Sequence, residues 1–215
     1  MIHHLSEAHS LVQIWINELR DVAIQQDRMR FRRNIERIGE VAAYEISKTF
    51  SYQPIAINTP LATTTSYTLQ QQPVVATILR AGIPLFQGLM NYLDKADSSF
   101  VAAYRKHDEQ DFHIEQSYVT APNLNGRPLI IADPMLATGA SFIKAIPSLL
   151  ANGTPSELHI VSVIASQEGI DFVHNSLPNA HIWVGAIDPG LNDKSYILPG
   201  LGDAGDLCFG EKLQN

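Results

Sequence analysis

Pro128-Leu-Ile-Ile-Ala-Asp133-Pro-Met-Leu-Ala-Thr138-Gly-Ala-Ser141 is an apolar run that ends on an acid and then passes through small residues. The pattern predicts a buried strand followed by a helix that begins near Gly139. Backbone N–H groups at a helix start, with the hydroxyls of Thr138 and Ser141, suit a phosphate monoester. A carboxylate would repel a phosphate, so we expect Asp133 to accept hydrogen bonds from hydroxyls of the same ligand, such as those of a ribose. A strand-to-helix turn without any ligand is the plain alternative.

The segments on both sides of this turn alternate between strand and helix patterns. Strands are predicted at Val74–Leu79, Phe100–Tyr104, Leu129–Asp133, Leu158–Ala165 and Ile182–Ile187. Helices are predicted after the Gly82-Ile-Pro84 turn, from Gly139 to near Asn152, and near Glu168–Ser176. Successive β-α-β units imply the α/β class, with a central parallel sheet flanked by helices.

Three further segments lie outside that alternation. Apolar residues at helical spacing predict two helices within about residues 9–49, and short β-rich pieces occupy about residues 54–70. From Arg105 to about Val119, alternating polar and apolar residues predict a mobile hairpin arm. No repeat or linker divides the sequence, so we expect residues 1–215 to form a single domain.

The composition fits an enzyme with a sizeable core and narrows the partners. Of 215 residues, 45% are hydrophobic and 17% are charged, and the net charge is −7. This balance argues against a general nucleic-acid or membrane binder, and neither a signal peptide nor an apolar run of about 18 residues is found. The single cysteine, Cys208, excludes an intrachain disulfide. We expect it to be an inert buried thiol in a reducing compartment, which makes the cytoplasm the expected location.

Two groups of ionisable residues have alternative interpretations. The arginines within Arg28–Arg33 resemble an anion site, but acids lie close by, so we favour a solvated or subunit-contact face. The eight histidines show no metal-ligand spacing. We expect surface roles for them, with His3 and His4 at the terminus and His107 and His113 on the arm.

The Pro128–Ser141 run resembles the phosphoribosyl-pyrophosphate loop of the type I phosphoribosyltransferases, and the similarity is closer to the uracil phosphoribosyltransferases among them. Three more segments carry it, in the family's order and at about its spacing: Ile78-Leu-Arg80-Ala-Gly82, Tyr104-Arg105, and Tyr196-Ile-Leu-Pro-Gly200-Leu-Gly-Asp203-Ala-Gly-Asp206 followed by Phe209-Gly210. The similarity runs from about Leu19 to Gly210. It implies the type I phosphoribosyltransferase fold with a β-hairpin arm and a C-terminal base-binding hood.

The resemblance also assigns residue roles. It implies that Arg80, Arg105 and Asp203 act in catalysis. Uracil would contact Ile197, Gly202, Asp203 and Ala204. The other substrate, 5-phosphoribosyl 1-pyrophosphate (PRPP), would be bound by Arg80, Arg105, Asp133, Pro134, Met135, Leu136, Ala137, Thr138, Gly139, Ala140, Ser141 and Asp203.

The pyrophosphate of such a substrate needs cations, and two arginines are placed to supply them. Arg80 follows a buried strand, where the small residues Ala81 and Gly82 are expected to let backbone N–H groups approach an anion. Arg105 stands at the root of the predicted arm and is expected to close over the ligand.

The resemblance implies Mg²⁺ as the cofactor. Many phosphoribosyltransferases have two adjacent acids at the position of Asp133-Pro134, whereas here the second residue is proline, as in the uracil enzymes. Asp203 is therefore the expected acid near the metal. Coordination through pyrophosphate and water is favoured over direct ligation by the protein, which the sequence leaves open.

The reaction implied is the transfer of the phosphoribosyl group of PRPP to uracil, which gives UMP and pyrophosphate in pyrimidine salvage. Two alternatives stay open: a phosphoribosyltransferase for another base, and a non-catalytic nucleotide-sensing regulator on the same fold. Retention of Arg80, Arg105, Asp133 and Asp203 favours turnover. The resemblance suggests a homodimer or higher homo-oligomer, and it raises GTP as a candidate effector.

Overall fold

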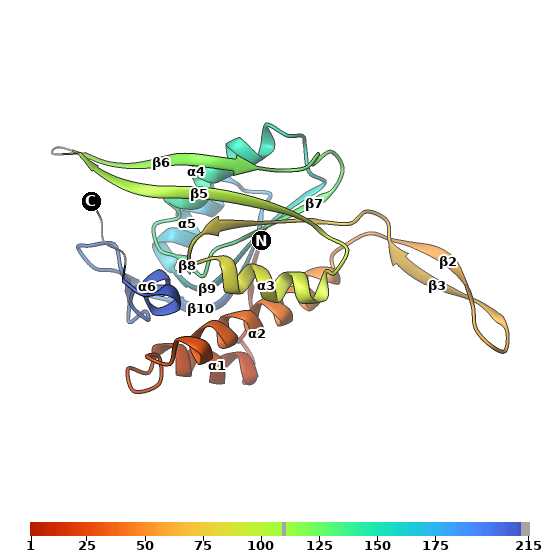
Figure 1. Cartoon of the computed structure of the whole chain (residues 1–215), viewed down its shortest axis with the longest axis horizontal. Coiled ribbons are helices and arrows are strands. Elements are labelled where there is room, and N and C mark those ends of the chain that lie inside the picture. The colour runs from red at the N-terminus through yellow and green to blue at the C-terminus, as the bar shows by residue number, and fades with distance from the viewer. Residues whose placement is uncertain (109–110, 212–215) are drawn as a thin grey trace.

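The computed structural model describes residues 1–108 and 111–211, with the backbone alone described for residues 103–108 and 111–117. Its centre is a twisted sheet (Figure 1). In spatial order the strands are β1 (Ile2–His4), β10 (His181–Asp188), β9 (Glu157–Ser166), β7 (Pro128–Ala132), β4 (Val74–Leu79), β5 (Asp97–Asp108) and β6 (Asp111–Thr120), and the short β8 (Met135–Leu136) also pairs with β9. Within the described chain, these strands pair in parallel except β5 with β6. The predicted α/β class is therefore confirmed.

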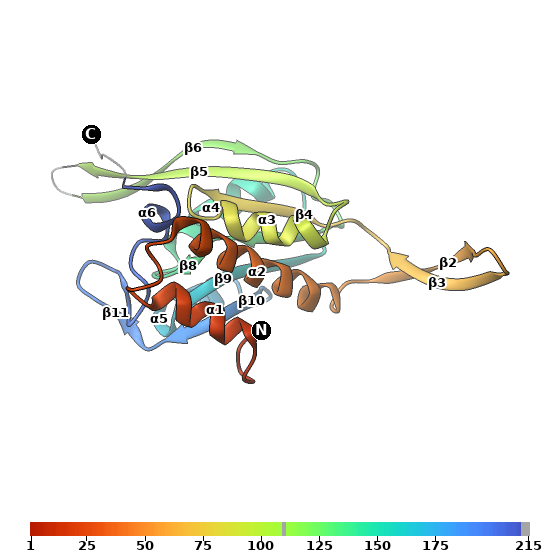
Figure 2. The same cartoon turned by 60° about the horizontal axis from the view of Figure 1, so that its bottom comes forward.

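Helices cover both faces of this sheet (Figure 2). On one face lie α1 (Leu11–Arg20), α2 (Arg28–Ser47) and α3 (Ile83–Tyr92), and on the other lie α4 (Ala140–Leu150) and α5 (Gln167–Ser176). Alternate residues of each strand serve the two faces, because Val75 packs with the first set and Val74 with the second. Strands buried on both sides are expected to be continuously apolar, which explains the run in β7.

The C-terminal part of the chain folds over the carboxyl edge of the sheet. It contains β11 (Gly190–Leu191), β12 (Ile197–Leu198) and α6 (Ala204–Phe209), and α6 packs against α2. In open α/β sheets, ligands bind outside the carboxyl ends of the strands. The hood formed by residues 190–209 therefore covers the edge at which a ligand is expected.

Two hairpins extend from the body (Figure 1). The backbones of β5 and β6 pair as the arm predicted between Arg105 and Val119, although β5 begins at Asp97; the mobility of this arm stays a prediction. The other hairpin, β2 (Tyr52–Asn58) and β3 (Thr63–Leu69), forms a sheet of its own and points away from the hood. Its projection was not predicted, since periodicity identifies strands but not their partners.

At the N-terminal edge of the sheet, several histidines are packed against other side chains, so the expectation that the histidines have surface roles is wrong for them. β1 was missed because three residues with two histidines lack a strand pattern. The ring of His3 stacks on Trp183 at 3.8 Å, and its Nε2 lies 3.1 Å from Nδ1 of His181. His159, two strands further in, is fully buried and its Nδ1 accepts a hydrogen bond from Trp183 Nε1. The side chains of His107 and His113 lie outside the described residues.

The structure also bears on membranes and metals. No helix among the described residues is long and apolar enough to cross a bilayer. In the same residues, no group of three or more His, Cys, Asp or Glu side chains could hold a metal ion.

Candidate functional site

A pocket opens at the carboxyl edge of the sheet, between the loop that follows β7 and the hood. One wall comes from α3's preceding turn, the β7–α4 loop and α4 itself, and the other comes from the hood. The wall residues are Ala81, Asp133, Met135, Ala137, Thr138, Gly139, Ser141 and Phe142 on the first side, and Lys194, Ser195, Tyr196, Ile197, Gly202, Asp203, Ala204 and Gly205 on the second. The two segments predicted to bind phosphate and base therefore face one space.

The loop after β7 is tied to the sheet through its carbonyl groups. Ser162 Oγ donates to the carbonyl of Asp133 at 2.7 Å, and Ser166 Oγ donates to that of Ala137 at 2.6 Å. The carbonyl of Pro134 accepts the backbone N–H groups of Val163 and Ile164. Because these three carbonyls are occupied by β9, they do not oppose an anion in the pocket.

Gly139 sits at the turn where α4 begins. Its φ is +76°, and an added Cβ would lie 2.5 Å from Val173 Cγ2 and 3.2 Å from the carbonyl oxygen of Gly169. Left-handed backbone favours glycine, and the contacts leave no room for a side chain. Any substitution here would disturb the packing of α5 as well as the loop, so Gly139 cannot be used to isolate ligand binding.

Three predicted members of this loop are not in the wall. Leu136 is fully buried in the core and pairs with β9, and Pro134 is buried behind the loop. Ala140 begins α4, and its N–H donates to Thr138 Oγ1 at 3.3 Å. The side chain of Leu136 packs in the interior, so a contact of this residue with PRPP could come only from its backbone, and its binding role stays a prediction. The alternation of strand β8 places Met135 toward the pocket and Leu136 away from it.

On the hood side, all four residues predicted to contact uracil line the pocket. Asp203 is the N-cap of α6, and its Oδ1 accepts the backbone N–H of Asp206 at 3.0 Å. This bond fixes the carboxyl group at the pocket wall, six positions after Ile197 in a loop that contains cis Leu198-Pro199. Asp203 lines the same pocket as Asp133, from the opposite wall.

The hood contributes wall residues that sequence reasoning did not assign. Lys194 and Ser195 come from a turn in which Asn192 Oδ1 accepts the N–H groups of Lys194 and Tyr196, at 3.0 and 2.9 Å. Tyr196 opens the recognised motif, but no role was given to it. An Asn followed by polar residues signals a turn, although nothing in that signal places the turn at a ligand.

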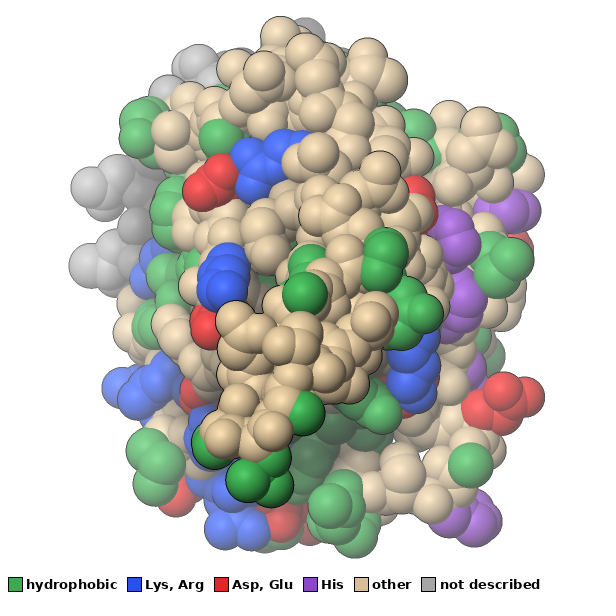
Figure 3. All heavy atoms as spheres, turned by 90° about the vertical axis from the view of Figure 1, so that its right-hand side faces the viewer, with side chains coloured by type: hydrophobic (Ala, Val, Ile, Leu, Met, Phe, Trp, Pro, Cys, Tyr) green, Lys and Arg blue, Asp and Glu red, His purple; other side chains and the backbone are tan. Residues whose placement is uncertain are grey.

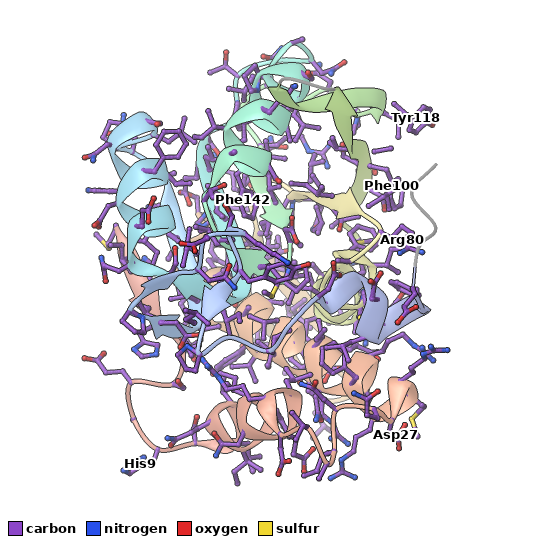
Figure 4. The ribbon with its side chains drawn as sticks, turned by 90° about the vertical axis from the view of Figure 1, so that its left-hand side faces the viewer. His9, Asp27, Arg80, Phe100, Tyr118 and Phe142 are labelled. Atoms are coloured by element: carbon purple, nitrogen blue, oxygen red, sulfur yellow. The ribbon has the colours of Figure 1, made fainter. Side chains whose placement is uncertain are left out.

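Of the two arginines predicted to bind pyrophosphate, the structure describes the side chain of Arg80 but not that of Arg105. Arg80 lies beside α6 (Figure 4), with Nη2 3.6 Å from Asp206 Oδ1 and with 46% of its side chain exposed. The neighbouring Gly82 N–H donates to the carbonyl of Ile78, so it is not available to an anion as expected, whereas Ala81 does line the pocket. Arg105 lies in β5, and its side chain is outside the described residues.

The basic cluster and the cysteine have ordinary structural roles. Arg30 binds Glu18 with two hydrogen bonds of 2.9 and 2.6 Å, and Arg33 lies 2.7 Å from Glu36. Cys208 is fully buried in α6, and burial raises the pKa of its thiol to about 12, which favours the neutral thiol at neutral pH. The predicted burial of this thiol is confirmed.

The fold is that of the type I phosphoribosyltransferases. The fold is similar to that of orotate phosphoribosyltransferase from Mycobacterium tuberculosis, solved in complex with PRPP, with a TM-score of 0.50 at 14% identity over 86% of this chain and 95% of that one. A solved protein structure from Aquifex aeolicus has a TM-score of 0.87 at 29% identity and covers 100% of both chains.

Sequence relatives narrow the class. Residues 6–211 match the family described as Uracil phosphoribosyltransferase. A relative with that name from Porphyromonas gingivalis is 50% identical over 212 residues, which are 98% of each chain. The chain belongs to the uracil phosphoribosyltransferase family, and the resemblance found in the sequence is confirmed.

Proposed function

We propose that the pocket between the β7–α4 loop and the hood transfers the phosphoribosyl group of PRPP to uracil, which gives UMP and pyrophosphate. One observation carries the proposal. The loop predicted to bind phosphate and the segment predicted to bind uracil are about 60 positions apart in the sequence, yet they line the two walls of one pocket. The family to which the chain belongs is named for this reaction.

The β7–α4 loop would hold the ribose phosphate of PRPP. The 5-phosphate would lie at the start of α4, against Thr138, Gly139 and Ser141, where the helix dipole and N–H groups favour an anion. Asp133 lies at the end of β7 in the same wall and would accept hydrogen bonds from the ribose hydroxyls. The anomeric carbon of the ribose would then face the hood.

Transfer requires charge stabilisation more than proton transfer. As the bond to pyrophosphate breaks, the ribose becomes oxocarbenium-like and negative charge grows on the leaving group. Arg80, beside α6, and Arg105, on the arm, are the cations proposed to meet that charge. A well-placed donor of this kind contributes about 3 kcal/mol to the transition state.

Mg²⁺ fits this pocket as a partly hydrated ion bound to the substrate. Mg²⁺ usually keeps several waters and binds one or two carboxylates together with substrate phosphates. The described residues offer no cluster of three ligands, but Asp133 and Asp203 line the same pocket from its two walls. Asp203 would hold the ion, directly or through water, and the ion would neutralise charge on the pyrophosphate.

Base choice would come from the backbone of residues 197–204. Uracil presents O4 as acceptor, N3–H as donor and O2 as acceptor, whereas cytosine inverts the first two. A fixed N–H facing O4 and a fixed carbonyl facing N3–H would both be left unpaired by cytosine. Buried mismatches of that kind give discrimination of roughly 10⁴.

We also propose a homodimer or higher homo-oligomer, which the β2–β3 hairpin supports. Residues 52–69 contain no Asp, Glu, Lys or Arg. Leu61 is 96% exposed at the tip, Tyr67 is 69% exposed, and Figure 3 looks onto this projecting, uncharged surface. An exposed uncharged edge invites pairing unless it is covered, and a second copy of the chain is the partner we propose. Leu61→Asp should then lower the mass measured by light scattering, whereas an unchanged mass would leave the hairpin without this role.

The proposal also includes a cytoplasmic location and GTP as an effector. The composition and the one buried cysteine support a cytoplasmic location. Stimulation by GTP would be tested by adding GTP to the activity assay described next; no described residue is assigned to it.

Pyrophosphate release from PRPP, measured with uracil, cytosine, hypoxanthine and no base, tests the function. We expect release with uracil, and kcat/KM for cytosine lower by roughly 10⁴. Release with another base but not with uracil would overturn the substrate. No release with any base, from a folded protein with Mg²⁺ present, would favour the regulator.

A further inference from the structure

Behind the hood wall of the pocket, an ion pair holds the backbone of the base-binding loop. Asp188 is the last residue of β10 and is 5% exposed, while Arg20 is the last residue of α1. Neither residue lines the pocket. We infer that Arg20 and Asp188 are positioning residues that fix Gly200 and thereby set the selectivity for the base, an inference that rests on the proposed function.

The contacts form a closed ring around Gly200. Arg20 Nη2 donates to Asp188 Oδ1 at 2.7 Å. Asp188 Oδ2 accepts the N–H of Gly200 at 3.0 Å, and the carbonyl of Gly200 accepts from Arg20 Nη1 at 3.3 Å. Both backbone polar groups of Gly200 are therefore bound by the same pair of side chains.

A second contact holds the next residue of the loop. Gln25, which is 8% exposed, donates through Nε2 to the carbonyl of Leu201 at 3.2 Å and to that of Leu19 at 2.9 Å. Leu201 is followed directly by Gly202 of the pocket wall. The end of α1 and the segment after it thus anchor two consecutive peptide units of the loop.

The position of Gly200 affects the positions of residues in the pocket wall. Gly200 has φ of +62°, and an added Cβ would lie 2.0 Å from the carbonyl oxygen of Ile197, so these two residues are in close contact. Ile197 is a wall residue. A shift of Gly200 would consequently move Ile197 on one side and Gly202 on the other.

Selectivity explains why such a clamp is needed. Backbone groups discriminate between bases only if they stay fixed, because a displacement of about 1 Å is enough to lose productive geometry. The loop contains Gly200, Gly202 and Gly205, and glycine gives the backbone more freedom than any other residue. A planar guanidinium that binds a carboxylate and a carbonyl together supplies rigidity that a lysine ammonium does not.

The chain offers a matched control for this pair. Arg30 of α2 binds Glu18 of α1 with two hydrogen bonds, so it is also an arginine–carboxylate bridge that involves α1. Among the described residues, Arg30 pairs with Glu18 and does not belong to the pocket wall. Arg30→Met therefore measures what the loss of a bridge near these helices does by itself.

The test compares Arg20→Met, Arg20→Lys and Arg30→Met with the wild type in the PRPP-dependent assay, after thermal melting has shown which variants are folded. We expect Arg20→Met to raise KM for uracil about tenfold and to lower the uracil-to-cytosine ratio of kcat/KM about tenfold, with KM for PRPP changed less than twofold. Arg20→Lys should change KM for uracil and the selectivity ratio in the same direction by smaller factors. Arg30→Met should change neither quantity.

Each outcome decides the inference. If Arg20→Met changed KM for uracil and KM for PRPP equally, the inference would be wrong. It would also be wrong if Arg20→Met left the uracil-to-cytosine ratio of kcat/KM as constant as Arg30→Met does. In either case Arg20 and Asp188 would form an ion pair with a structural role only. If Arg20→Met does not fold, Arg20→Lys alone carries the comparison. A wild type that converts a different base would refute the proposed substrate instead, and the same variants would then be compared with that base.

Discussion

The two walls of the pocket are built in different ways. The wall proposed to bind the 5-phosphate, called the phosphate wall below, is formed mainly by one short stretch between β7 and α4, and the residues that hold this stretch, Ser162 and Ser166, are each 29 positions away on the neighbouring strand. The hood wall, which we propose binds the base and call the base wall, is a glycine-containing loop held by Arg20 and Gln25 from 176 to 180 positions away. The first wall is thus specified by local sequence, whereas the second depends on contacts between the two ends of the chain.

The largest effect is expected where the base wall meets the leaving group. Asp203→Asn removes a charge but keeps an N-cap for α6, since asparagine accepts the Asp206 N–H as aspartate does. We expect kcat to fall about 100-fold, a loss of about 2.7 kcal/mol in the transition state. Asp171→Asn, an exposed site on α5, serves as the control. A kcat within threefold of the wild type for Asp203→Asn would remove this carboxylate from the chemistry.

A tenfold effect is expected on the phosphate wall. Ser141 lies in the first turn of α4 and lines the pocket. Ser141→Ala should raise KM for PRPP about tenfold, because a hydrogen bond to a charged group is worth about 1.5 kcal/mol, and should leave KM for uracil unchanged. Ser148→Ala, further along the same helix, is the matched comparison. If Ser141→Ala raised KM for uracil instead, the two walls would be wrongly assigned.

The difference between the walls also explains what could be predicted from sequence. Strand β4 was predicted with its observed bounds, and the turn at Gly139 was recognised, because periodicity and turn chemistry are local properties. The burial of Leu136 was missed, since a motif lists residues without saying which way each side chain points. The clamp at Asp188 and strand β1 were also missed, because each depends on a partner more than 100 positions away.

A smaller effect, on stability rather than on activity, is expected from His159, which lies at the opposite end of the sheet from both walls of the pocket. Burial, and then the neighbouring His181 and His3, lower the pKa of His159 to about 3. Glu157 Oε2 lies 3.1 Å from His159 Nε2 but remains partly solvent-exposed, so burial dominates. Below pH 6.5 the unfolded chain therefore binds a proton that the native chain excludes, and the free energy of unfolding falls as pH is lowered from 6.5 toward 3.

Urea unfolding between pH 7 and 5 checks this expectation. The slope of the free energy of unfolding against pH has an upper bound of about 1.4 kcal/mol per pH unit for one titrating group. His159→Gln, which does not titrate, should flatten it. The same slope in the variant and the wild type would show that His159 is not its source, and the KM values of both substrates should be unaffected by this substitution at pH 7.

The central claim is that the two walls are built and act independently. A double-mutant cycle on kcat/KM with Ser141→Ala and Arg20→Lys tests it most directly, because residues that share no partner contribute additively. We predict that the loss in the double variant equals the product of the two single losses within about twofold, or about 0.4 kcal/mol. A departure of tenfold or more would show that the two ends of the chain and the phosphate loop form one coupled unit, and would contradict the account.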